Sequence, residues 1–297
     1  MRLEFGTGSR FGNFSFSKAQ LLVNHALSKG IRRFDTGYAY GNYKSQPLLA
    51  RCLEKKIVNS REDISISTKT PCYSSEIVET AVEKSLCTFK SNYIDTLYLW
   101  GPNQKELENK EIFKKLKSFK SSGKIKKILI NTHSLNLMEK ISTGFYDEIS
   151  GIMLDFNLLQ QDRYSVIKRA KNNGLSIVAG TILCQGLLID SSFKIILRSL
   201  SPFYLGRMIL KKETRRFLKP SKKLRAYCNS NFDKEIRKKM PLSFVTNESL
   251  IDSIAIGMMS ISSINHNVEV FKNPLDSAIT KKVGQWALDN CQIKDLL

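Results

Sequence analysis

Three side chains near the start of the chain, an acid, a phenol and an amine, have the types needed to move a proton together. Asp35 and Tyr40 lie in FDTGYAYGNYKS, and Lys69 lies near the end of ISISTKT. Each follows or ends a short apolar run that is typical of a buried strand. An ammonium beside a phenol lowers the pKa of the phenol, and a carboxylate keeps that ammonium charged, so the set indicates a general acid. The alternative is a structural ion pair between Asp35 and Lys69, with Tyr40 as a surface aromatic.

Trp100 ends the next apolar run, DTLYLW, where such a site is expected to hold a polar or titratable group. An indole keeps one donor, its Nε1–H, but it neither titrates nor accepts a hydrogen bond. A tryptophan at a strand end more often packs than reacts. We therefore expect Trp100 to line a substrate pocket.

The segments that must position these residues alternate between short apolar runs and stretches of helical period. A capping box at Ser17–Gln20 predicts the start of a helix that Gly30 closes. Six strand–helix units in series imply a parallel sheet with helical crossovers. The expected strands are 31–34, 64–67, 96–99, 127–130, 152–154 and 176–179, and the expected helices between them are 47–53, 76–89, 110–119, 135–141 and 163–171.

The last part of the chain adds a helix at 243–250, a strand at 253–256 and a short final strand at 268–271. Eight strands in this order favour a closed (β/α)8 barrel, the TIM barrel, formed as one domain over residues 1–297. An open doubly wound sheet is the alternative. In both architectures the site lies at the carboxyl ends of the strands. Asp35, Lys69, Trp100 and Asn131 all fall at such ends.

At these residues the chain resembles the aldo-keto reductase family. The family pattern D-T-A-x-x-Y-G is met by Asp35, Thr36, Tyr40 and Gly41, with Gly37 at the small position, and the family lysine matches Lys69, 69 − 35 = 34 positions on. Trp100 stands where the family has a histidine. The resemblance runs from GTG near the start to NHNVEVF near the end. It implies nicotinamide-dependent oxidoreduction of a carbonyl or alcohol, with Tyr40 as proton donor, Lys69 as the modulator of its pKa and Asp35 as the holder of Lys69.

The resemblance also implies a nicotinamide cofactor, NADP or NAD. The residues that match its expected contacts are Asn131, Gln185, Gly257, Ser260, Ser263 and Asn267, and His133 is expected to face the substrate pocket. A Gly turn followed by a helix N-terminus offers backbone N–H groups to a phosphate. Met153 stands where the family has a glutamine. Ser263 stands where the family has the arginine for a 2′-phosphate, and His266 where it has an acid. The preference between the two nucleotides is therefore left open.

Two functions from different classes fit these residues. The first is an enzyme of aldo-keto reductase type. The second is a catalytically reduced barrel that acts as a binding or regulatory module. Trp100, Met153 and Ser263 motivate the second.

The formal charge of +20 invites an interpretation as a nucleic-acid binder, but no zinc-ligand spacing and no basic–aromatic RNA-binding motif accompanies it. Residues 188–240 hold fifteen Lys and Arg against four Asp and Glu, so they contribute 15 − 4 = +11. We expect this basic insertion, which follows the sixth predicted strand, to be a solvated excursion with an amphipathic helix at 202–218. A clamp over an anionic ligand, or weak association with an anionic surface, is the functional alternative.

The remaining composition predicts a cytoplasmic protein, and the resemblance implies a small-molecule carbonyl or alcohol substrate. No apolar run approaches the ~18–20 residues that a membrane span needs. The first ten residues, MRLEFGTGSR, lack the apolar core of a signal peptide. Six scattered cysteines without C-x-x-C spacing are typical of reduced, mostly buried thiols, and the three histidines are too dispersed for a metal site.

Overall fold

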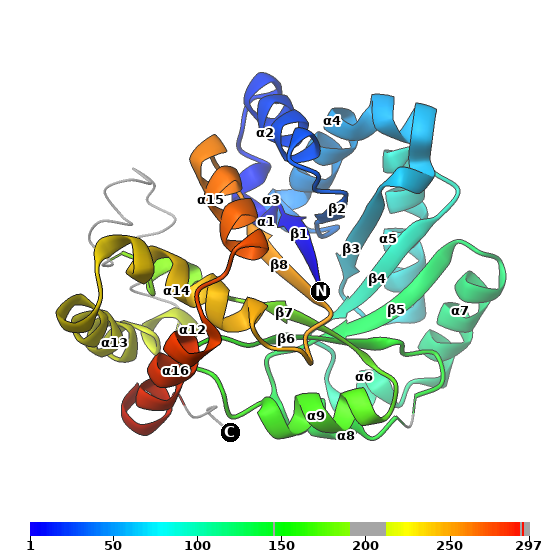
Figure 1. Ribbon diagram of the computed structural model, residues 1–297. Coiled ribbons are helices and arrows are strands. Elements are labelled where there is room, and N and C mark those ends of the chain that lie inside the picture. The colour runs from blue at the N-terminus through cyan, green and yellow to red at the C-terminus, as the bar shows by residue number, and fades with distance from the viewer. Residues whose placement is uncertain (145, 191–211, 292, 294–297) are drawn as a thin grey trace.

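The computed structural model describes residues 1–144, 146–190, 212–291 and 293. In this part of the chain eight parallel strands form a closed barrel, each pairing with the next strand in the chain (Figure 1). The strands are β1 (Arg2–Gly6), β2 (Arg33–Asp35), β3 (Ser65–Thr70), β4 (Ile94–Trp100), β5 (Ile125–Asn131), β6 (Gly151–Asp155), β7 (Ser176–Gly180) and β8 (Ser253–Gly257). The predicted (β/α)8 barrel is confirmed, and the open doubly wound sheet is excluded.

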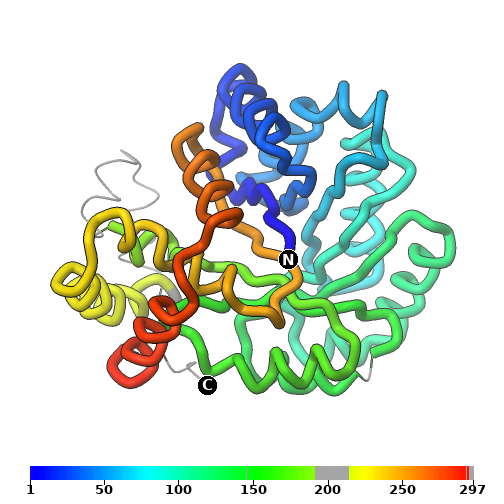
Figure 2. The backbone as a smooth tube through the Cα atoms, in the orientation of Figure 1, coloured from blue at the N-terminus to red at the C-terminus, as the bar shows by residue number. Residues whose placement is uncertain are grey.

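Helices cover the outside of this barrel (Figures 1 and 2). Along the chain they are α1 (Gly8–Phe11), α2 (Phe16–Ser28), α3 (Tyr40–Tyr43), α4 (Ser45–Ser60), α5 (Ser75–Phe89), α6 (Gln104–Leu107), α7 (Lys110–Ser121), α8 (Leu135–Ser142), α9 (Tyr164–Asn172), α12 (Lys212–Arg215), α13 (Leu218–Asn231), α14 (Lys234–Thr246), α15 (Ile261–Lys272) and α16 (Ser277–Cys291). Short 3₁₀ turns lie at Arg61–Asp63 and Cys184–Gly186.

The first strand was missed from the sequence, and the final predicted strand, 268–271, was wrong. β1 closes the ring by pairing with β8, with Leu3 opposite Ile254. Residues 268–271 belong to helix α15, because the buried Ile264 and Val268 continue a helical period that Ser260 caps. The strand count was therefore right while one member was wrong. The basic insertion follows the seventh strand, β7, and not the sixth.

Helix α2 begins earlier than its predicted cap. The side chain of Ser15, not Ser17, accepts a hydrogen bond from the backbone N–H of Lys18 at 3.4 Å. Ser17 lies inside the first turn and is exposed. Gly30 ends the helix as predicted, at φ +87°, a left-handed conformation that glycine adopts at little cost.

Helix α14 is also longer than predicted. It begins at Lys234, capped by the side chain of Asp233, and continues through Pro241 to Thr246. The predicted helix began only at Ser243, two residues after Pro241, although a proline inside a helix removes one backbone donor. Here the buried Met240 and Leu242 anchor the turn on both sides of the proline.

The inside of the barrel has an apolar half and a polar half. Tyr98, Leu129, Met153, Val178 and Ala255, one from each of β4–β8, form a buried cluster that we call the apolar belt. Two positions further along each strand, facing the same interior, stand Trp100, Asn131, Asp155, Gly180 and Gly257. The β1–β3 side of the interior holds buried polar residues instead, namely Glu4, Asp35, Ser67 and Lys69.

Part of the basic insertion folds as helices beside the barrel. Helices α13, α14 and α16 pack together over a second apolar core that includes Phe217, Leu224, Cys228, Met240 and Val283 (Figure 1). Residues 202–211 of the predicted amphipathic helix 202–218 lie outside the described residues. The rest of that stretch, 212–218, is not one continuous helix, because α12 ends at Arg215 and α13 begins at Leu218.

Several charges of the insertion are used locally. Arg225 donates to the carbonyl of Leu187, and Lys239 pairs with Glu269 at 2.7 Å. No helix among the described residues is long and apolar enough to cross a membrane. All six cysteines are unpaired; Cys87 is exposed and the other five are buried.

The position of the α2 cap gives a stability test. Ser15→Ala should lower the free energy of unfolding by about 1 kcal/mol, because it removes the acceptor for a first-turn N–H. Ser17→Ala, two residues on, should change it by less than about 0.5 kcal/mol. Urea unfolding of the two variants measures the difference. A larger loss of stability for the Ser17 variant would show that Ser17 caps the helix and would contradict the assignment to Ser15.

Candidate active site

The carboxyl ends of β2 and β3 bring together an acid and an amine. The ammonium of Lys69 donates to the carboxylate of Asp35, and its Nζ lies 3.5 Å from the carbonyl oxygen of Thr36. Both side chains are buried, Lys69 with 1% of its surface exposed and Asp35 with 5%. Neighbouring parallel strands carry them, and Asp35 stands opposite Ser67 in the register, two positions before the lysine. The pair predicted from the sequence is therefore formed.

Burial and charge set the protonation of this pair. Burial raises the pKa of Asp35 to about 6, against the opposing effect of the Lys69 charge. Burial works to lower the pKa of Lys69, but the charges of Asp35, Tyr40 and Glu4 outweigh it, so that pKa is raised. At neutral pH the site therefore holds a carboxylate and an ammonium.

Tyr40 is placed above this pair by a tight turn after β2. The backbone N–H of Tyr38 donates to the carbonyl of Lys69 at 2.9 Å, which ties the turn to β3. The Nζ of Lys69 lies 5.5 Å from the centroid of the Tyr40 ring. A Cβ on Gly37 would lie 2.9 Å from that ring, so glycine is the residue that lets the phenol fold over the turn. Gly41 has φ +61°, and a side chain there would collide with Ser45.

Trp100, at the end of β4, completes this group. Its ring meets that of Tyr40 edge to face, with centroids 5.6 Å apart and planes at 88°. Its side chain is 39% exposed, so one face remains open at the mouth of the barrel. The four residues singled out first from the sequence thus lie together, and the pocket-lining role of Trp100 stays a prediction.

Asn131, the expected carboxamide contact, lies next along the mouth. It pairs with Trp100 in the β4–β5 register, and its Nδ2 donates to the carbonyl of Met153 at 3.3 Å. Its Oδ1 makes no hydrogen bond within the described residues. Met153 turns into the apolar belt, at the position where the family has glutamine. One polar contact is thereby replaced by packing.

The expected phosphate contacts gather where β8 meets α15. The register places Gly6 opposite both Asp35 and Gly257, so this loop is two strands away from the ion pair. Ser260 caps α15, and it exchanges hydrogen bonds of 3.1 Å with Ser263 in a capping box. The backbone N–H groups of the first turn have no helical acceptor, which leaves an N-terminus suited to an anion.

Asn267 and Gln185 differ in how they are engaged. Asn267 is 4% exposed on α15, and within the described residues its side chain makes no hydrogen bond. Gln185, in the turn after β7, accepts a hydrogen bond from the Thr214 hydroxyl at 3.0 Å. It therefore ties helix α12 of the basic insertion to the turn after β7. A role for Gln185 in holding a cofactor stays a prediction.

A second polar cluster at the mouth was not found from the sequence. Asp155, at the end of β6, is bonded to His133 Nδ1 at 2.7 Å and to the Thr181 hydroxyl at 2.5 Å, and Arg216 approaches it to 3.8 Å. Asp155 is buried, whereas the side chain of His133 is 60% exposed. The signal was present, because SGIMLD ends on an acid just as the runs before Asp35 and Lys69 end on polar groups.

The pKa values of this pair shift in opposite directions. The hydrogen bond to the carboxylate of Asp155 raises the pKa of His133 above its ordinary value. Burial works to raise the pKa of Asp155, but the hydrogen bonds from His133 and Thr181 and the charge of Arg163 outweigh it, so that pKa is lowered. The imidazole of His133 is therefore exposed and anchored by Asp155, and its role in a substrate pocket stays a prediction.

The chain is similar to known proteins over almost its whole length. Residues 2–286 match the sequence profile of the Aldo/keto reductase family. An L-galactose dehydrogenase of Arabidopsis thaliana is 24% identical over 273 residues, which cover 88% of this chain and 80% of that protein. An uncharacterised oxidoreductase of Bacillus subtilis (strain 168) is 24% identical over 201 residues, 63% of each chain. The solved holo form of an aldo-keto reductase from Bacillus halodurans matches the fold with a TM-score of 0.72 at 20% identity, covering 96% of this chain and 91% of that one.

The His133–Asp155 pair makes a titration test. A histidine with a raised pKa contributes stability below its unfolded value, near ~6.5, and that contribution is lost as pH rises through its folded value. Asp155→Asn removes the charge, so the pKa of His133 should fall toward ~6.5 and the stability gained at acid pH should shrink. Imidazole Cε1–H chemical shifts against pH measure this directly. The signals of His25 and His266 serve as internal controls, and an unchanged His133 titration would contradict the pairing.

Proposed function

The chain belongs to the aldo/keto reductase family, and we propose that it is an NAD(P)-dependent oxidoreductase in which Tyr40 exchanges a proton with a small carbonyl or alcohol substrate. Its family membership makes it an oxidoreductase in general terms. One observation carries the finer proposal: a buried ammonium, Lys69, lies beneath the Tyr40 ring and is held by the buried carboxylate of Asp35.

The chemistry follows from this arrangement. A carbonyl that accepts hydride at carbon must receive a proton at oxygen, and the Tyr40 hydroxyl is the donor at the mouth. The phenolate left behind is stabilised by the ammonium of Lys69, because opposite charges attract strongly where water is excluded. Asp35 keeps Lys69 protonated and fixes its position. In the oxidation direction the same phenolate accepts the proton of an alcohol.

The cofactor implied by the family is a nicotinamide dinucleotide, which supplies or accepts the hydride when bound. Two features support its fit. The Oδ1 of Asn131 is left without a hydrogen bond beside Trp100, and the buried side chain of Asn267 lacks a partner next to the capped start of α15, within the described residues. Asn131 would hold the carboxamide, and Asn267 would meet the adenine. The loop from Gly257 through Ser260 to Ser263 would receive the phosphates, and Gln185 would border the nicotinamide.

The substrate proposal starts from Trp100. Its exposed indole face, beside the Tyr40 hydroxyl, offers a flat apolar surface of the kind on which sugar rings stack. His133 adds an exposed imidazole that can bond a polar group of the substrate. The similar Arabidopsis protein is named as an L-galactose dehydrogenase, so an aldose with its polyhydroxyl chain is the first substrate class to screen.

A second candidate, a catalytically reduced barrel that binds a ligand without turning it over, rests on a specific contact. Trp100 packs edge-on against Tyr40 where the family has a histidine. An indole cannot replace the orienting and proton-accepting capacity of an imidazole. The intact ion pair beneath Tyr40 favours the enzyme over this alternative.

Removal of the Tyr40 hydroxyl tests the enzyme. Tyr40→Phe should lower kcat at least ~100-fold, because the proton donor is lost while the ring and its packing remain. Tyr43→Phe, on an exposed neighbour, is the matched control and should keep activity. Initial rates with a panel of aldoses and simple aldehydes measure the effect, and unchanged turnover in the Tyr40 variant would remove it as the acid.

Binding of the cofactor is the companion measurement. NADPH and NADH should each be titrated against a Trp286→Phe protein, so that Trp100 is the one indole that reports quenching. Tyr40→Phe should bind the preferred nucleotide within about two-fold of its parent. If neither nucleotide binds, as checked by calorimetry, the oxidoreductase proposal fails.

Trp100 itself separates the two candidates. If the indole limits catalysis, Trp100→His should raise turnover on generic aldehydes several-fold, since it restores a group that donates and accepts hydrogen bonds. Trp100→Phe keeps the ring without the donor and should give no such gain. Equal rates for both variants would place the limitation elsewhere in the site.

A further inference from the structure

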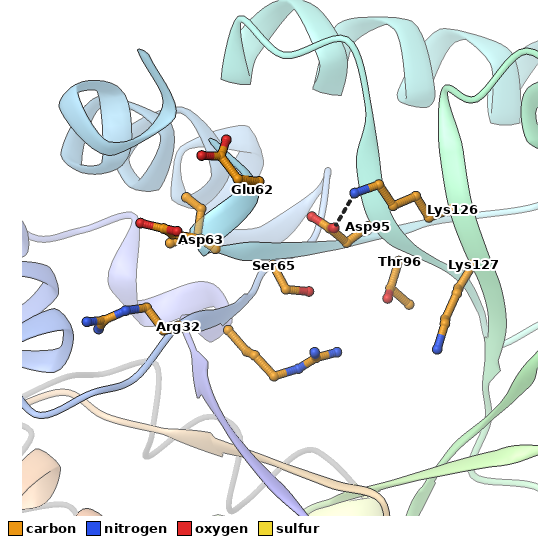
Figure 3. A pocket seen from close by; sticks show the side chains of 10 residues that line it. Arg32, Glu62, Asp63, Ser65, Asp95, Thr96, Lys126 and Lys127 are labelled. Atoms are coloured by element: carbon orange, nitrogen blue, oxygen red, sulfur yellow. Dashed lines mark hydrogen bonds and ion pairs between the residues drawn. The ribbon is translucent and has the colours of Figure 1, made fainter. Parts of the chain in front are cut away.

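A cavity of about 290 Å³ lies at the amino-terminal mouth of the barrel, at the opposite end from Tyr40 (Figure 3). It is lined by the first residues of β2–β5 and by the turn that precedes β3. Every lining residue except Ile64 carries a polar or charged group, in contrast to the apolar belt above it. Since a bound water needs only about 10–15 Å³ of such space, this cavity has room for a larger polar ligand.

Four hydrogen-bond donors from four adjacent strands face this cavity. They are Arg33 on β2, Ser65 on β3, Thr96 on β4 and Lys127 on β5. The register pairs Arg33 with Ser65 and Thr96 with Lys127, so they form two neighbouring rungs. In Figure 3 the side chains of Ser65, Thr96 and Lys127 extend toward the same space.

Three of these donors, all but Arg33, have no partner within the described residues. Within the described residues the hydroxyls of Ser65 and Thr96 make no hydrogen bond, and the ammonium of Lys127 makes neither a hydrogen bond nor an ion pair. Thr96 is 4% exposed, Ser65 is half-buried and Lys127 is exposed. Their donors are therefore available to water or to a ligand that enters the cavity.

Arg33 is fixed in place from inside the barrel. Its Nε donates to the buried carboxylate of Glu4 at 3.1 Å, and the two Nη groups make no hydrogen bond within the described residues. Glu4 is 1% exposed. One bond therefore holds the guanidinium, and its fork is left to face the cavity. This is the geometry with which arginine binds oxyanions bidentately.

The acidic residues around the cavity do not cancel this positive set. Asp63 pairs with Lys56 at 2.5 Å. Asp95 pairs with Arg61 at 2.7 Å and with Lys126 at 3.3 Å. Glu62 is exposed, and Figure 3 shows it directed away from Ser65 and Lys127.

We propose that this amino-terminal mouth is a second ligand site, which binds an oxyanion of the phosphate type through Arg33, Ser65, Thr96 and Lys127. The charge, the two hydroxyls and the guanidinium fork match a tetrahedral dianion, and the volume admits a small organic group attached to it. The ligand is thus inorganic phosphate or a small phosphate monoester. The site is separate from the phosphate contacts expected at α15, which lie at the carboxyl mouth.

Calorimetric titration tests this site. The full-length protein is titrated at fixed ionic strength with inorganic phosphate and, separately, with glycerol 2-phosphate. Lys127→Gln should weaken phosphate binding at least 10-fold, and Thr96→Val, which keeps the shape but removes one donor, should weaken it several-fold. Lys124→Gln, on the same chain segment but paired with Glu83 on the surface, is the matched control and should bind within two-fold of the wild type.

Ser263→Ala distinguishes the two ends of the barrel and should leave this binding unchanged. Binding of both probes with the Lys127 dependence supports a site for phosphate monoesters, and binding of inorganic phosphate alone supports a free-ion site. Absence of binding to the wild type overturns the proposal. Equal losses in Lys127→Gln and Lys124→Gln overturn it too, since they would report only the general positive charge of the protein.

Discussion

A buried ammonium is the constraint on which this structure depends. Lys69 is enclosed in the barrel, and removing an unpaired charge from water costs several kcal/mol. A carboxylate must therefore reach it, and Asp35 does so from the adjacent strand. The parallel register brings the two side chains together, and closure of the barrel excludes the water that would otherwise solvate them. The turn through Gly37 then puts a phenol over the charge, and the proposed role of Tyr40 as an acid rests on this arrangement.

The strand ends were the predictable part of the molecule. A strand in a parallel barrel is an apolar run that stops at a polar group, and Asp35, Lys69 and Asn131 all showed this pattern in the sequence. Local patterns failed where partners were distant. RLEFG is too short and too mixed to identify as a strand until β8 pairs with it, and VEVF in α15 favours a strand until its helical cap is known. The cavity could not be predicted from the sequence for the same reason, because only the register of four strands brings Arg33 and Lys127 to one place.

The interior of the barrel is divided into an apolar side and a polar side, and both run between its two ends. The apolar belt fills the β4–β8 side, and it excludes water between the ends. On the β1–β3 side a line of polar groups runs from Arg33 through Glu4 toward Asp35 and Lys69. The charge of Glu4 contributes to the raised pKa of both members of the ion pair. Glu4 therefore links Arg33, near one end of the barrel, with the ion pair near the other.

Ring closure through β1 and β8 has a consequence for how the protein is made. Leu3 pairs with Ile254, 254 − 3 = 251 positions later, whereas the next most distant pairing, Val178 with Ser253, spans 253 − 178 = 75 positions. During synthesis, at roughly 5–20 residues per second, β1 must wait more than about ten seconds for its second partner. Until then the nascent half-barrel keeps an open strand edge, a surface that invites pairing with other chains. The incomplete barrel during synthesis, rather than the finished fold, is therefore the state in which this chain is most open to aggregation.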